Sequence, residues 1–127
     1  MTMKLPKYMR IQGREISYKT GKPTGMFALN WRRIREDVYS EQDKLIFQRE
    51  EDWFNDNLPN PPYYGQNNEN PQGAITYFKT ENIDGMKERI GILMGLLDKY
   101  SVPYDVVYTD YIGEIIYEDE YQVGVID

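Results

Sequence analysis

The strongest constraint on the fold is a stripe of apolar side chains in the second half of the chain. Apolar residues recur there every three or four positions, at Ile83, Met86, Ile90, Leu93, Met94, Leu97 and Tyr100. This spacing places them on one face of a helix, which the pattern predicts over 84–100. Such a stripe is typical of a core-facing helix rather than of a cofactor site.

Two further helices are predicted upstream of this stripe. Residues 26–38 carry apolar side chains on one helical face, at Phe27, Trp31, Ile34 and Val38. The next helix is predicted over 40–57, with Ser40 as its N-cap and acidic residues in its first turn. Glu50 falls inside the apolar arc of that helix. We expect Glu50 to pair with an arginine at a helix interface; the alternative is a bent helix in which Glu50 faces water.

Short alternating segments predict strands on both sides of these helices. Residues 8–12 and 15–20 are predicted to form a hairpin whose turn lies at Gly13 and Arg14. Four more strands are predicted at 74–79, 104–109, 113–118 and 120–126. Residues 59–73, with four prolines, four asparagines and two glycines, predict a loop between the two halves.

The order of these elements predicts an α+β fold. We expect an antiparallel or mixed sheet of about five short strands, with three helices packed on one face. A chain of 127 residues has room for one modest core. We therefore expect residues 1–127 to form a single domain that contains the loop 59–73.

The chain contains neither cysteine nor histidine, which excludes several chemistries. Zinc, haem and iron–sulfur sites depend on those side chains, as do Ser-His-Asp and Cys-His catalysis. We predict no cofactor, no metal site and no catalytic residue. The longest apolar run near a helix, Ile90 to Leu97, is far shorter than the roughly 18 residues that a membrane span needs. We therefore expect no membrane segment and a cytoplasmic location.

Charge is distributed unevenly along the chain. Residues 1–36 hold nine basic and two acidic side chains, a net charge of +7, whereas residues 101–127 hold seven acidic and no basic ones, a net charge of −7. One interpretation is that the two ends pair across the sheet or face water. The other is that the acidic end is a recognition surface, because a field of one sign steers an oppositely charged partner.

Tyrosines alternate with the acidic residues near the C-terminus. We predict that ten of these side chains bind a partner: Asp105, Tyr108, Asp110, Tyr111, Glu114, Tyr117, Glu118, Asp119, Glu120 and Tyr121. Tyrosine supplies contact area at low entropic cost, and carboxylates along a sheet imitate the phosphates of a nucleic acid. The pattern predicts a non-enzymatic protein-binding module whose partner has a basic groove, such as a nucleic-acid-processing enzyme that it inhibits. The net charge of −6 disfavours direct binding to nucleic acid.

In its gross features the chain is similar to some phage and mobile-element inhibitors, including anti-CRISPR proteins and DNA mimics. The shared features are small size, acidity, many tyrosines and the absence of cysteine and histidine, and they involve no motif. Two other functions stay open. One is a divalent-metal-dependent phosphoesterase or nuclease that uses the same carboxylates. The other is self-association, in which the basic end of one copy meets the acidic end of another.

Overall fold

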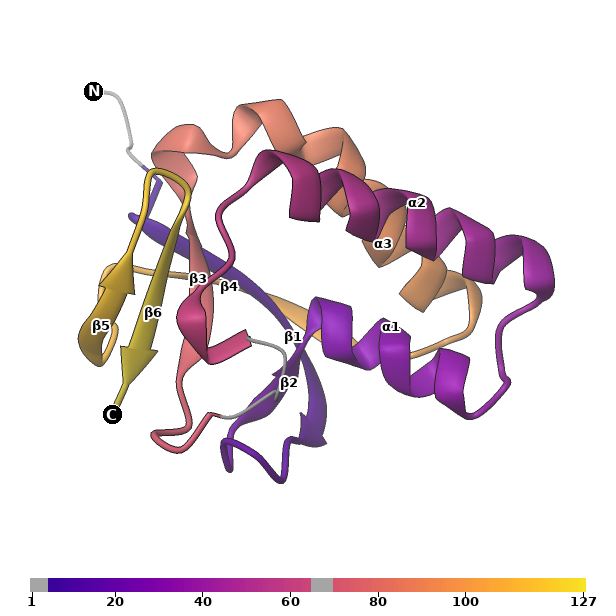
Figure 1. Cartoon of the computed structure of the whole chain (residues 1–127), viewed down its shortest axis with the longest axis horizontal. Coiled ribbons are helices and arrows are strands. Elements are labelled where there is room, and N and C mark those ends of the chain that lie inside the picture. The colour runs from indigo at the N-terminus through magenta and orange to yellow at the C-terminus, as the bar shows by residue number, and fades with distance from the viewer. Residues whose placement is uncertain (1–4, 65–69) are drawn as a thin grey trace.

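Three helices cover one face of a curled, antiparallel sheet (Figure 1). The computed structural model describes residues 5–64 and 70–127. Its helices are α1 (Met26–Arg35), α2 (Glu41–Asn57) and α3 (Lys87–Lys99), with 3₁₀ turns at Pro62–Tyr64, Thr80–Asn82 and Asp84–Met86. Its strands are β1 (Tyr8–Ile16), β2 (Pro23–Gly25), β3 (Ile75–Lys79), β4 (Tyr104–Thr109), β5 (Glu114–Glu118) and β6 (Gln122–Ile126). The predicted α+β class is confirmed.

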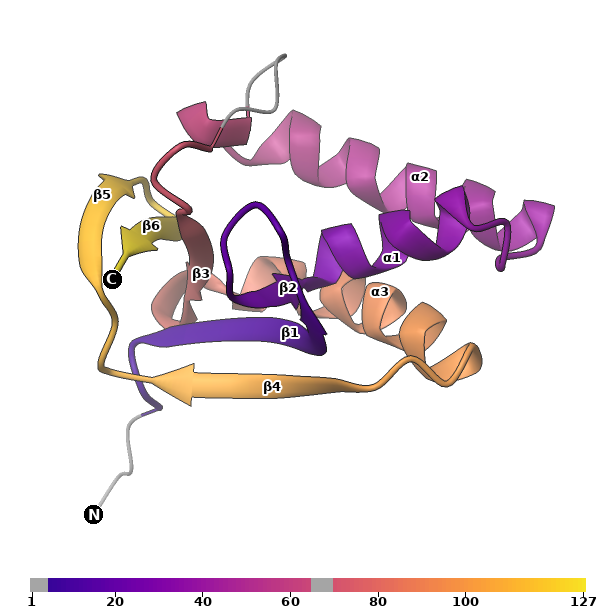
Figure 2. The same cartoon turned by 90° about the horizontal axis from the view of Figure 1, so that it is seen from below.

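Strand β1 lies at the centre of the sheet and pairs with three other strands. Along one edge, β4 pairs with β1 from Tyr8 to Gly13. The other edge of β1 is shared by β3 near Tyr8 and by β2 between Gln12 and Ile16. The sheet continues from β3 to β6 and then to β5, so β4 and β5 are the outermost strands on its two sides (Figure 2).

The apolar core lies between the helices and the sheet. Each helix contributes fully buried side chains: Leu29 of α1, Phe47 of α2, and Leu93 and Leu97 of α3. Met9 and Ile11 join this cluster from β1. The predicted role of the stripe over 83–100 is therefore confirmed, because its members form one wall of the core.

Two polar predictions for α2 are confirmed. Ser40 is the N-cap, and its Oγ accepts a hydrogen bond of 3.2 Å from the Asp43 N–H. Glu50 is only 1% exposed. Its Oε2 accepts a hydrogen bond of 2.9 Å from Nη1 of Arg89 on α3, and its Oε1 lies 3.1 Å from Nε of Arg49. A buried carboxylate needs such partners because an isolated buried charge is costly.

The predicted hairpin around Gly13 and Arg14 is wrong, because β1 runs straight through both residues. Gly13 instead allows close packing: a Cβ there would lie 2.6 Å from the Leu29 methyl groups of α1. The chain reverses later, where the Ser17 N–H bonds the Lys22 carbonyl at 2.9 Å and Gly21 adopts a φ of +71°. Such a φ suits glycine, which has no Cβ to clash.

The first helix is shorter than predicted and uses a different face. It ends at Arg35, and Asp37 follows with a φ of 57°, a left-handed conformation that stops the helix. Val38 is therefore exposed and outside α1. The buried residues of α1 are Met26, Leu29 and Asn30, while the predicted stripe is only partly buried. Its aromatic members pack sideways against α2 rather than down onto the sheet.

Among residues 5–64 and 70–127, no helix combines the length and the apolar character that crossing a bilayer requires.

Candidate functional site

The ten predicted binding residues lie at two separate places in the sheet. Four of them lie on or just after β4: Asp105, Tyr108, Asp110 and Tyr111. The other six lie on β5 and in the turn that follows it: Glu114, Tyr117, Glu118, Asp119, Glu120 and Tyr121. We call residues 104–111 the β4 edge and residues 114–126 the β5–β6 hairpin. Strands β1, β3 and β6 separate the two in the sheet, and a link of residues 112–113 joins them along the chain.

In the β5–β6 hairpin, the carboxylate of Asp119 holds the turn together. Its Oδ1 accepts hydrogen bonds from the N–H groups of Tyr121 at 2.7 Å and Gln122 at 2.9 Å. Its Oδ2 accepts from the Tyr117 hydroxyl at 2.6 Å and from Nε2 of Gln122 at 3.2 Å. The hydrogen bond to Asp119, with burial and the nearby negative charge, raises the pKa of Tyr117 to about 12. Asp119 is thus committed to the local structure.

The body of the hairpin is packed closely against its surroundings. Glu118 forms an ion pair of 2.6 Å with Lys79 of β3. The ring of Tyr63, which is buried, meets the Tyr117 ring edge-on at 6.4 Å between centroids. Tyr63 also covers Gly124, where a Cβ would lie 2.1 Å from its hydroxyl oxygen. The pairing of β5 with β6 shifts register between Ile115 and Tyr117, and such a bulge disrupts the strand edge.

The β4 edge is regular where β5 is irregular. Six consecutive residues of β4 pair with β1 without a register shift. Within the described part of the chain, no strand pairs with the outer side of β4. Val106, Tyr108 and Tyr111 are 42%, 49% and 90% exposed. The backbone groups of such an edge are free to pair with another strand.

The two faces of β4 differ in polarity. Residues opposite each other in an antiparallel pair share a face of the sheet. Val106 and Tyr108 therefore lie on the helix face, because they pair with Ile11 and Met9. Asp105 lies on the other face, where its carboxylate is 3.7 Å from the guanidinium of Arg14.

Basic residues from elsewhere neutralise part of the acidic C-terminal segment. Arg14 pairs with Asp105 and Lys22 lies 3.5 Å from Asp127, so the two oppositely charged ends of the chain do meet. At the start of β1, the Lys7 N–H donates to the Asp110 carboxylate at 2.9 Å. Glu114 and Glu120 have no ion pair or side-chain hydrogen bond among the residues that the structure describes.

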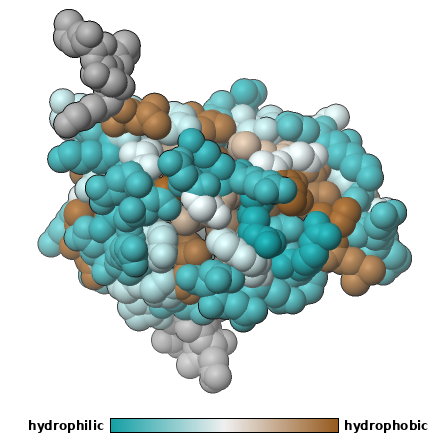
Figure 3. Space-filling model, turned by 90° about the horizontal axis from the view of Figure 1, so that it is seen from above, coloured by the Kyte–Doolittle hydropathy of each residue, from teal (hydrophilic) through white to brown (hydrophobic). Residues whose placement is uncertain are grey.

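Within residues 5–64 and 70–127, no three carboxylates gather closely enough to hold a metal ion. The acidic residues follow the two outer strands instead of converging on one point. On the face drawn in Figure 3, apolar residues lie in separate patches among hydrophilic ones.

A comparison with known protein families, curated proteins and solved structures finds no match to this chain. The chemistry of the two surfaces therefore has to support any proposal about function.

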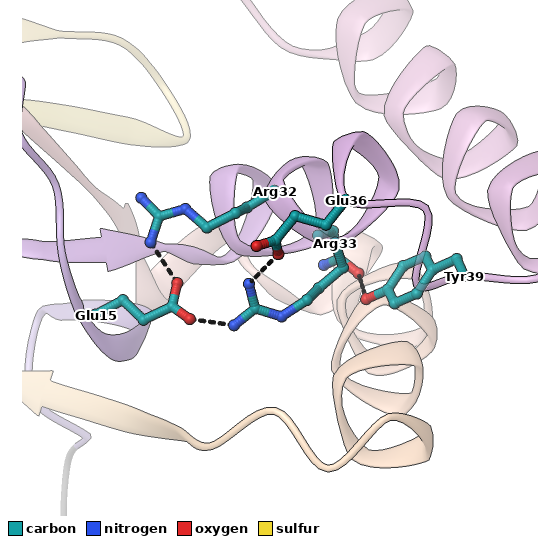
Figure 4. A network of polar contacts seen from close by, with 6 residues as sticks. Glu15, Arg32, Arg33, Glu36 and Tyr39 are labelled. Carbon is teal, nitrogen blue, oxygen red and sulfur yellow. Dashed lines mark hydrogen bonds and ion pairs between the residues drawn. The ribbon is translucent and has the colours of Figure 1, made fainter.

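A charged cluster that sequence reasoning missed joins the end of β1 to α1 (Figure 4). The Glu15 carboxylate accepts hydrogen bonds from both Arg32 and Arg33, and Arg33 also bonds Glu36 at 3.1 Å. Burial opposes ionisation of Glu15, but the hydrogen bonds and charges of Arg33 and Arg32 outweigh it and lower the pKa of the carboxyl. These arginines, which the sequence places on the solvent side of the helix, thus stabilise the junction between α1 and the sheet.

Proposed function

We propose that this protein is a non-enzymatic protein-binding module that receives an extended segment of its partner along the β4 edge. The observation that carries this proposal is the combination of regular pairing on the inner side of β4 with an outer side on which none of the described strands pairs. An extended peptide adds to such an edge through backbone hydrogen bonds, and the neighbouring side chains supply specificity.

The side chains of the β4 edge indicate what that segment should contain. On one face, the incoming strand would lie beside Val106 and Tyr108, which favour apolar contact. On the other face and at the strand end it would meet Asp105 and Asp110, which favour lysine or arginine. The expected partner is a strand in which basic and apolar residues alternate. The net charge of −6 would speed its approach.

Lysine and arginine side chains line the grooves in which nucleic-acid-processing enzymes hold phosphates. Blocking such a groove would make the protein an inhibitor of an enzyme of that kind. This finer proposal draws support from the acidic side chains of the β4 edge, and it implies binding that weakens as the salt concentration rises.

A second copy of the chain is a poorer occupant of the β4 edge. Residues 104–111 contain two aspartates and no basic residue. Antiparallel pairing of two such strands brings acidic side chains together, and like charges on facing strands are destabilising. The charge of the β4 edge therefore favours a foreign, basic strand.

A synthetic peptide of eight alternating lysine and valine residues tests the proposal by calorimetry and by amide NMR. We expect saturable binding that shifts the amide signals of 104–111 and weakens at high salt. A control peptide with alternate backbone nitrogens methylated keeps its charge but loses half of its N–H donors, and should bind at least about tenfold more weakly. Equal affinity of the two peptides would contradict strand addition.

Variants in which neutral amides replace the carboxylates distinguish the contribution of the β4 edge from that of the β5–β6 hairpin. The double variant Asp105→Asn and Asp110→Asn should weaken binding of the unmethylated peptide about five- to tenfold. Its matched control is Glu114→Gln with Glu120→Gln, which removes the same charge from the hairpin and should leave the affinity within about twofold. Equal losses in both variants would show that only the overall charge matters.

The competing enzymatic function is tested with metal ions. Specific binding of Mg²⁺ or Mn²⁺ to the native carboxylates would raise the melting temperature, because a ligand of the native state stabilises it. We expect no such rise at millimolar metal. A clear rise would favour the phosphoesterase instead.

A further inference from the structure

A groove of about 1120 Å³ lies on the opposite side of β1 from the proposed strand-binding site. One wall is the β1–β2 turn with α1, and the other is the end of α2, the segment 58–63 and β3. Its base includes Arg10 and Ile11, where β2 and β3 diverge from the edge of β1 that they share (Figure 2). The divergence follows from the register, because β3 pairs near Tyr8 and β2 from Gln12 onwards.

Aromatic rings line much of this groove. Phe27 and Phe54 meet edge-on at 5.2 Å between centroids, and Phe78 lies 6.4 Å from Phe54. Trp31 adds its indole on the α1 side. Aromatic walls of this kind offer stacked and edge-on contacts to a flat, apolar ligand.

The charge of the groove is opposite to that of the whole protein. Among the described residues, its lining holds four basic side chains, and Glu51 is its one carboxylate. Lys19 and Arg35 form no ion pair within residues 5–64 and 70–127. Arg10 is 8% exposed, and its Nη1 donates to Oε1 of Gln12 at 2.8 Å and to the Pro23 carbonyl at 2.9 Å. A buried, well-held guanidinium is a strong anchor for an anion.

Thr24 provides an independent sign of a ligand. Thr24 is one of the residues that line the groove and is 2% exposed, yet its Oγ1 has no hydrogen-bond partner among the described residues. Within the part of the chain that the structure describes, no other buried side-chain oxygen or nitrogen lacks a hydrogen-bond partner. Buried polar groups are nearly always paired, and leaving one unpaired costs stability.

We propose that this groove binds a small organic anion that carries an aromatic ring. The ring would contact the phenylalanines of the walls, the acidic group would lie among the basic side chains, and a polar atom of the ligand would bond the Thr24 hydroxyl. This proposal does not depend on the strand-binding function, because the groove and the β4 edge share no residue.

An aromatic sulfonate, 1-anilinonaphthalene-8-sulfonate, is a suitable probe, and neutral N-phenyl-1-naphthylamine is its matched control. The chain has two tryptophans. Trp31 lines the groove, whereas Trp53 packs against Arg89 with the guanidinium 4.6 Å from its ring. In NMR spectra of the indole N–H groups, assigned with Trp53→Phe, the sulfonate should shift the Trp31 signal and leave that of Trp53 in place. A shift of Trp53 alone, or equal affinity for the neutral control, would overturn the proposal.

Two variants test the polar groups. Thr24→Val keeps the side-chain shape and removes an unpaired hydroxyl, so the protein should remain at least as stable while its affinity for the sulfonate falls about threefold or more. Arg35→Gln should weaken binding about fivefold, and Lys87→Gln on α3, with the same change in charge outside the groove, should not. An affinity that Thr24→Val leaves unchanged would contradict the role of the hydroxyl as a ligand group. Equal effects of Arg35→Gln and Lys87→Gln would contradict a site for the anion in the groove.

Discussion

The β4 edge and the β5–β6 hairpin are built from the same kinds of residue and use them in opposite ways. Both combine tyrosines with carboxylates near the C-terminus. In the hairpin, Asp119 and Tyr117 bond each other and the turn, and Glu118 pairs with Lys79. At the β4 edge, Tyr108 and Tyr111 remain exposed beside two aspartates.

The backbone explains this difference better than the composition does. A turn leaves backbone N–H groups without strand partners, and the carboxylate of a nearby aspartate accepts hydrogen bonds from them. In a straight edge strand, the backbone groups on the inner side form hydrogen bonds with the neighbouring strand, so the side chains are not needed for these bonds and can make other contacts. Within the described residues, the side chains of Asp105, Tyr108 and Tyr111 make no hydrogen bond to the backbone, whereas Asp110 accepts one from the Lys7 N–H. Acidic and aromatic residues therefore indicate a binding surface best where few of them are bonded to the backbone.

The largest expected difference between the two surfaces concerns stability. Asp119→Ala removes the acceptor of four hydrogen bonds, two of them from backbone N–H groups. We expect it to lower the free energy of unfolding by about 3 kcal/mol, since bonds to a charged acceptor are strong. Asp105→Ala loses only an exposed ion pair and should cost about 0.5 kcal/mol or less. Urea denaturation followed by circular dichroism measures both, and similar losses would show that the two aspartates play the same role.

The same contrast shows what the sequence could and could not reveal. The helices α2 and α3 were predictable, because their period and the Ser40 cap are local signals. Gly13 was misread, since a glycine that makes room for Leu29 looks the same in sequence as a turn glycine. The sequence was sufficient to predict which types of residue the candidate surface contains. The division of this surface into two places was not predictable, because it depends on β4 pairing with β1, almost a hundred residues earlier in the chain.

A second stability prediction tests the packing of the hairpin. Gly124→Ala would place a Cβ 2.1 Å from the Tyr63 hydroxyl and 2.7 Å from two ring carbons. Because Tyr63 is buried and bonded to Thr76, it has little freedom to move, and we expect a loss of about 2 kcal/mol. Gly91→Ala on α3 is the control: its Cβ would meet open space, and alanine should raise stability by up to about 1 kcal/mol. A neutral Gly124→Ala would mean that Tyr63 does not fix the hairpin.

A smaller effect is expected in self-association. We expect the two aspartates of the β4 edge to keep this edge from pairing with another copy of the chain. The double variant Asp105→Asn and Asp110→Asn should therefore form weak dimers, which sedimentation velocity at high protein concentration would detect. Glu114→Gln with Glu120→Gln should remain as monomeric as the parent, because the bulge in β5 already disrupts that edge. Dimers formed equally by both variants would point to net charge rather than to the β4 edge.

The smallest expected effect is a change in alkaline stability to which Tyr117 of the hairpin contributes. The hydrogen bond that the Tyr117 hydroxyl donates to Asp119 raises the pKa of Tyr117 from 10.0 to about 12 in the folded protein. The unfolded chain therefore releases this proton first, so the contribution of Tyr117 to stability is complete below pH 10 and is lost as the pH rises towards 12. Tyr117→Phe should make the fall in urea midpoint between pH 9 and pH 11.5 shallower than it is in the parent protein. Tyr39, whose pKa burial raises to about 12, and Tyr104, whose pKa burial also raises, are present in both the parent and the variant and so cancel from the comparison. An unaltered slope in Tyr117→Phe would mean that the bond to Asp119 contributes nothing to the hairpin, and the contrast between the two surfaces would then rest on the backbone contacts of Asp119 alone.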